Sequence, residues 1–84
     1  MRGATTERVR DVLTRVLRVP PTMFASPARL DAIAAVDSLS LAELAAALDE
    51  EFAIEIDGER LTAGLSLPQI VALVEEAQGA AASR

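Results

Sequence analysis

The run 38-SLSLAELAAALDEEF-52, with Asp37 directly before it, decides how the rest of the chain is arranged. Asp37 is a favourable N-cap, and its charge suits the positive end of a helix dipole. The run predicts a helix from Asp37 or Ser38 to about Phe52, with the Ser38 hydroxyl on its first turn. Its apolar stripe has the three- and four-residue spacing of an amphipathic helix and consists of Leu41, Leu44, Ala45, Leu48 and Phe52.

The residues before this run predict one further helix and a long loop. Apolar residues at helical spacing predict a helix from about Glu7 to about Arg18, which Pro20 and Pro21 end because proline lacks the amide hydrogen. Residues 19–36 show no sustained period, and long connections of this kind are often functional. Residues 30–33 suit a short helical turn. The residues expected to pin the loop to the core are Met23, Phe24, Leu30, Ile33 and Val36.

The residues after the run predict a short helix and a final long one. Residues 53–56 alternate as a strand does, but no second strand is available, so we expect a connecting segment. Residues 57–58 signal a turn, and residues 59–63 predict a short third helix that Gly64 ends. A capping box from Ser66 to Gln69 begins the last helix, which is expected to end near residue 78.

Length and composition limit the chain to one small core. It has 84 residues, of which 51% are hydrophobic and only 2% aromatic. A chain of this size cannot stabilise two cores. We therefore predict an all-α fold, a small four-helix bundle of three main helices plus a short third one, with a long loop between the first two helices. The predicted domain spans residues 1–84, with an ordered core at about 6–78 and frayed termini.

The absence of two residue types limits the metal sites and reactions that this chain could support. The chain has no Cys and no His, so thiolate metal sites and the commonest general base are both absent. No metal site and no enzymatic activity are therefore expected. No apolar run is long enough for a membrane span, and the start lacks the apolar part of a signal peptide, which predicts a cytoplasmic protein without membrane contact.

Charge is divided unevenly along the chain, whose net charge is −5. Residues 1–30 carry six Arg against two acids, whereas residues 31–84 carry two Arg against eleven acids. An acidic surface repels nucleic acid and attracts basic protein surfaces. We expect protein partners and no nucleic acid, and we expect Arg8, Arg10, Arg15 and Arg18 to form a solvated face.

These features together resemble the acyl carrier protein family over about Val9 to Glu76. The most specific part is 37-DSL-39, followed by 43-EL-44, 48-LDEEF-52 and 54-IEI-56. In that family the serine is the attachment site of 4′-phosphopantetheine, and the resemblance implies the same for Ser38, with Asp37 and Leu39 beside the arm. With no base to activate it, Ser38 is a passive acceptor, and the thiol that holds cargo belongs to the prosthetic group.

The resemblance also implies partner-binding residues on the same helix. Glu43, Asp49 and Glu50 match acidic positions that family members present to basic patches on enzymes, although by themselves they are simply solvated. Leu39 lies off the apolar stripe, so it is either exposed beside the arm or covers the end of the loop. Family members often have glycine and an acid where this chain has Ala35 and Ser40.

The resulting hypothesis is a monomeric, stand-alone carrier of acyl or aminoacyl thioesters. The departures from the family pattern favour polyketide or related specialised biosynthesis over primary fatty acid biosynthesis. The implied partners are a phosphopantetheinyl transferase and enzymes of the acyltransferase, ketosynthase or acyl/aminoacyl ligase type. One alternative is a helical adaptor that is never modified. Another is a small enzyme that uses Ser38 or the carboxylates directly, but it lacks a base and a credible pocket.

Overall fold

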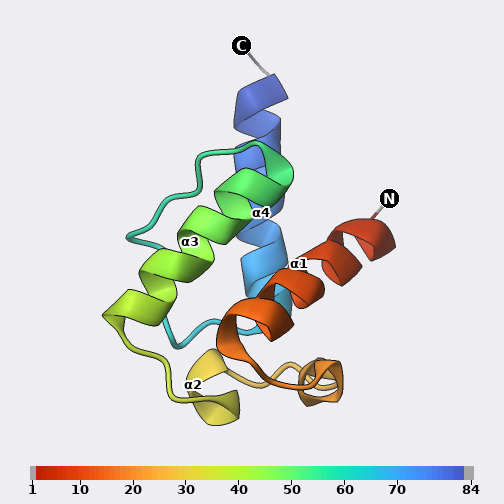
Figure 1. Cartoon of the computed structure of the whole chain (residues 1–84). Helices are drawn as coiled ribbons and strands as arrows, with labels where there is room; N and C mark the ends of the chain where they lie inside the picture. The colour runs from red at the N-terminus through yellow and green to blue at the C-terminus, as the bar shows by residue number, and fades with distance from the viewer. Residues whose placement is uncertain (1, 83–84) are drawn as a thin grey trace.

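The computed structural model describes residues 2–82, which form helices and connecting segments without a strand. Three long helices make the frame: α1 (Arg2–Leu17), α3 (Ser38–Phe52) and α4 (Leu67–Ala82). α1 packs against both α3 and α4 (Figure 1). A 3₁₀ helix, η1 (Pro21–Phe24), and the short α2 (Leu30–Ile33) lie together at one end of the frame, in the long connection from α1 to α3. The all-α prediction is confirmed.

The core lies between the three long helices and is entirely apolar. No polar or charged residue is buried among residues 3–79. Burying an aliphatic side chain of this kind contributes roughly 1.5–3 kcal/mol, so the spacing of these residues determines the packing. The fully buried side chains from the long helices are Val9, Val12, Leu13, Leu44, Leu48, Ile70 and Val74.

The long loop is part of this core, as predicted, with one exception. Phe24 and Leu30 are buried, and Ile33 and Val36 are partly buried against the core. Met23 is 43% exposed, so its predicted role as a core contact is wrong. Met23 and Phe24 are neighbours in a tight 3₁₀ turn, which directs adjacent side chains to different sides, and Phe24 takes the inward position.

Backbone pairing fixes the loop against the segment before α4. The Leu30 amide donates to the Leu65 carbonyl at 2.9 Å, and the Asp31 amide donates to the Ala63 carbonyl at 3.0 Å. Arg29 and Ser66 form an isolated antiparallel bridge beside them. Two irregular segments that are distant in sequence thus satisfy each other's backbone groups.

The predicted third helix is absent from the segment that precedes this pairing. Residues 59–63 are not helical: turns at 58–60 and 63–64 replace the helix that Gly64 was expected to end. The Asp57 carboxylate accepts the Glu59 amide at 3.0 Å, which favours a turn, and Leu61 is buried. The short helix of the bundle is therefore α2, before α3. The segment 53–56 is a connection, as predicted.

The ends of α1 and α4 extend beyond their predicted bounds. α1 begins at Arg2 instead of about Glu7. α4 continues to Ala82 instead of ending near residue 78, because the alanines after Gly79 are strong helix formers. The capping box is confirmed in part, since Gln69 Oε1 accepts the Ser66 amide at 2.9 Å. Of the predicted frayed tail, residues 83–84 lie outside the described range.

Candidate functional site

Ser38 is the first residue of α3, and its side chain is exposed. Asp37, directly before it, is the N-cap, as predicted: its Oδ1 accepts the Ser40 amide at 2.8 Å and the Ser40 hydroxyl at 3.0 Å. The hydrogen bond from the Ser40 amide, followed by that from its hydroxyl, lowers the pKa of Asp37 below the ordinary value of 3.8. Asp37 is therefore a charged cap at neutral pH.

The cap leaves Ser38 available for reaction with an external group. Ser40 is committed to Asp37, whereas the Ser38 hydroxyl has no hydrogen-bond partner among residues 2–82. The Asp37 carboxylate also accepts the Ser40 amide, a first-turn donor that would otherwise be available to an added anion. The helix N-terminus therefore exposes an unbonded hydroxyl, but its capacity to stabilise a phosphate is partly taken up by Asp37.

A hollow of about 340 Å³ begins at Ser38. One wall is α3 and the other is the connection between α3 and α4. Apart from Ser38 its lining is apolar or glycine: Leu41, Ala42, Ala45, Gly58 and Leu61. Gly58 and Leu61 were not among the predicted site residues, because a turn signal at residues 57–58 does not indicate which helix the turn will face.

The outer face of α3 carries Leu39, Glu43 and Glu50. These residues are separated by four and seven positions, about one and two helical turns, and therefore lie on one side. Leu39 is 67% exposed, which decides between its two alternatives in favour of exposure. Neither glutamate forms an ion pair with another residue in the range 3–79. This face combines an apolar side chain next to Ser38 with two uncompensated charges.

The other two acids near the end of α3 make internal contacts. Asp49 Oδ1 accepts the Ile56 amide at 2.8 Å and so orients the segment that leaves the helix. Glu51 forms an ion pair with Arg8 of α1. Arg8, one of the arginines expected on a solvated face, is exposed but also paired with this acid. A partner-binding role for Asp49 stays a prediction, and the hydrogen bond to Ile56 gives it a structural one.

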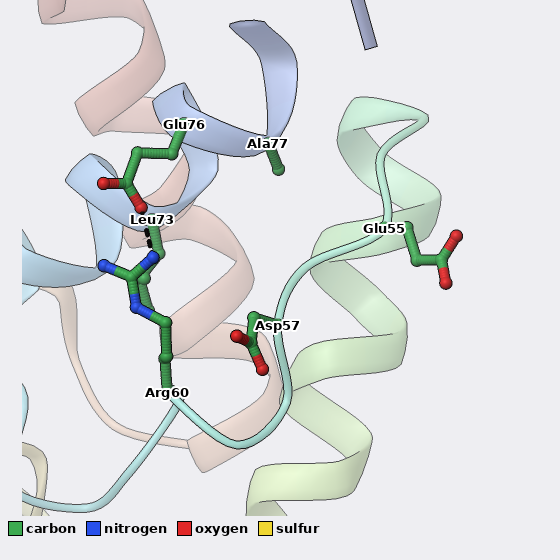
Figure 2. Close-up of a pocket in the computed structure, with 6 residues that line it drawn as sticks. All are labelled: Glu55, Asp57, Arg60, Leu73, Glu76 and Ala77. Carbon is green, nitrogen blue, oxygen red and sulfur yellow. Dashed lines mark hydrogen bonds and ion pairs between the residues drawn. The ribbon is translucent and has the colours of Figure 1, made fainter. Parts of the chain in front are cut away.

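A second hollow, of about 160 Å³, lies between α4 and the segment after α3 (Figure 2). Arg60 crosses it to Glu76, with 2.6 Å between Nη1 and Oε2, while the Glu55 side chain points away from this pair. The carboxylates therefore do not converge. No group of three or more potential ligands able to hold a metal ion occurs within residues 2–82.

Comparison with known families gives a match to the model described as phosphopantetheine attachment site, over residues 7–75. Because this match covers most of the chain, the protein belongs to that family. Domains of this kind are carriers to which 4′-phosphopantetheine is covalently attached, and they work with a phosphopantetheinyl transferase and biosynthetic enzymes. Neither curated proteins nor solved structures gave a significant match. None of the helices in residues 2–82 has the length and apolar character needed to cross a membrane.

Proposed function

We propose that Ser38 is the residue that carries 4′-phosphopantetheine. The observation that supports this is its exposed, unbonded hydroxyl at the first residue of α3, within the matched segment. The Ser40 hydroxyl is bonded to Asp37, and the Ser66 hydroxyl is bonded to Gln69 at 3.3 Å. Ser26 is exposed but lies in the loop, away from any N-terminus of a long helix.

The residues around Ser38 fit this group. The hydroxyl supplies the acceptor oxygen, and the transferase supplies the base that takes its proton, because the chain has no His and Asp37 is committed to the cap. The hollow beside Ser38 offers apolar surface where an arm begins. When bound, 4′-phosphopantetheine supplies a thiol that holds cargo as a thioester, which a chain without Cys lacks.

The same geometry suggests how partners meet the carrier. Leu39, Glu43 and Glu50 lie on the outer face of the helix that begins with Ser38, so an enzyme bound there has the attachment residue at the edge of its contact surface. Charged contacts of this kind increase the association rate and keep release fast. The arm then raises the effective concentration of the cargo at the bound enzyme.

The proposed role is a monomeric, cytoplasmic carrier of acyl or aminoacyl groups in polyketide or related specialised biosynthesis. Support comes from Ala35, from Ser40 and from the arginine-rich α1, which depart from the pattern of carriers in primary fatty acid synthesis. The enzymes served would be of the acyltransferase, ketosynthase or acyl/aminoacyl ligase type. The alternative, an adaptor that docks without modification, differs in one respect: its Ser38 stays unmodified.

Intact-mass measurement tests the proposal. The protein is incubated with coenzyme A and a broad-specificity phosphopantetheinyl transferase, alongside Ser38→Ala and the matched control Ser26→Ala. We expect the mass of one phosphopantetheine group to be added to the wild type and to Ser26→Ala, with no addition to Ser38→Ala. A wild type that gains no mass, or a Ser38→Ala variant that gains as much as the wild type, would rule out Ser38 as the carrier residue.

A further inference from the structure

Arg8 connects the exposed side of α1 to the last residues of α3. Its Nε and Nη2 donate to Glu51 Oε2 at 3.2 and 3.1 Å, and Nη2 also donates to the Glu51 backbone carbonyl at 2.7 Å. The guanidinium carbon lies 4.4 Å from the centre of the Phe52 ring. One side chain thus engages the carboxylate, the carbonyl and the ring of two consecutive residues.

These contacts explain why an acid is tolerated at this end of α3. The last carbonyls of a helix lack intrahelical donors, and the negative end of the dipole disfavours an acidic side chain. Arg8 compensates for both, since its planar fork supplies a donor to the carbonyl and a cation to the Glu51 carboxylate. Glu50, the preceding residue, has no such compensation within residues 3–79.

The α1 side of α3 therefore differs electrostatically from its outer face. A hollow of about 530 Å³ on the α1 side is lined by Arg15, Ala47, Glu50 and Glu51. A basic side chain that approaches there meets the positive charges of Arg8 and Arg15. Glu50 lies at the border between the two sides, because it also lines this hollow beside Arg15. On the outer face the same side chain meets Glu43 and Glu50, neither of which is paired to a cation among residues 3–79.

We infer that Arg8 determines which acids of α3 a basic partner surface can use. By holding Glu51, it removes that carboxylate from the docking surface and confines the partner to the face that carries Leu39, Glu43 and Glu50. Arg8 is thus a positioning residue that acts through Glu51. The inference rests on the proposed carrier function, in which an enzyme binds along α3 to reach Ser38.

An NMR titration of the ¹⁵N-labelled protein with a tetra-arginine peptide tests this inference without requiring modification of Ser38. In the wild type at low salt, we expect the largest charge-dependent shifts at Glu43 and Glu50, with little change at Glu51. In Arg8→Gln the Glu51 carboxylate is free, so Glu51 should join the residues that shift and the peptide should bind about threefold more tightly. Added salt should remove this gain in affinity.

Two control variants separate this effect from net charge and from folding. Arg18→Gln removes the same charge from an exposed residue that does not contact Glu51, so it should tighten binding less and leave Glu51 unperturbed. Arg8→Lys keeps a cation beside Glu51, so Glu51 should again stay outside the responding set, although lysine lacks the fork that also serves the Glu51 carbonyl. Arg8→Gln is also expected to lower the thermal midpoint. If Arg8 had only a structural role, the substitution would weaken peptide binding instead of tightening it.

Two results would overturn the inference: equal responses of Glu51 and Glu50 in the wild type, or the same gain in affinity for Arg8→Gln and Arg18→Gln. Failure of the mass assay on Ser38 would leave this titration interpretable, because the peptide binds through charge alone. The two proposals therefore fail independently. With a transferase that has a basic carrier-binding surface, Arg8→Gln should also raise the second-order rate constant of transfer at low salt.

Discussion

Replacing Leu30 by Ala tests whether the long loop belongs to the core. The Leu30 side chain is 0% exposed, and its amide is bonded to the Leu65 carbonyl at 2.9 Å, so the residue holds a fixed position at the start of α2. The substitution removes three carbon atoms, worth about 2.4 kcal/mol at ~0.8 kcal/mol for each, and leaves a cavity. The expected loss in free energy of unfolding is about 2–5 kcal/mol, a large part of the ~4–13 kcal/mol typical of a domain this size.

Urea unfolding followed by far-UV circular dichroism measures this loss. We expect a lower denaturation midpoint with an unchanged slope, and a thermal midpoint lower by about 8–40 °C at ~4–8 °C for each kcal/mol. Met23→Ala is the matched control, because Met23 lies in the same loop but is 43% exposed, and its replacement should cost about 1 kcal/mol or less. If Leu30→Ala costs no more than Met23→Ala, the loop does not share the core and the packing described above is wrong.

Three further predictions concern α3. Hydrogen bonds lower the pKa of Asp37 in the folded state, so the wild type should be more stable than Asp37→Asn above pH 3.8. This difference in stability should disappear as the pH falls through the pKa of Asp37 in the folded state. Urea unfolding across this pH range measures the difference, and a difference independent of pH would contradict the prediction. Glu43→Arg and Glu50→Arg should slow transfer by the phosphopantetheinyl transferase at low salt while helicity is retained, and unchanged rates would exclude the acidic docking face. Asp49→Ala should instead lower stability by about 1–2 kcal/mol, because the Ile56 amide loses its acceptor, with a smaller effect on transfer.

Much of the fold could be predicted because it depends on interactions within one or two helical turns. The apolar spacing of residues 38–52 and the capping preference of Asp37 determine where α3 begins and which side is buried. The Ser66 amide, which donates to Gln69 Oε1, likewise marks the start of α4. The predicted third helix failed because a local turn preference and the burial of Leu61 outweighed a weak helical pattern.

The candidate site likewise has one part that neighbouring residues predict and another part that they do not. Ser38 and its cap follow from residues adjacent in sequence, and so does the shared face of Leu39, Glu43 and Glu50. The hollow beside Ser38 could not be predicted, because Gly58 reaches α3 only after the chain has turned back along it. Spacing also cannot distinguish a solvated acid from one that is already bonded.

The sequence by itself therefore determined the long helices, the position of the Ser38 hydroxyl at a helix start and the acidic character of the helix that follows it. Only the tertiary structure decided which of those acids remain available. Arg8 and Glu51 are 43 residues apart, and they meet because α1 packs against α3 at that point. Periodicity reports neighbours along one helix, whereas the partner of an exposed charge depends on where another helix crosses it.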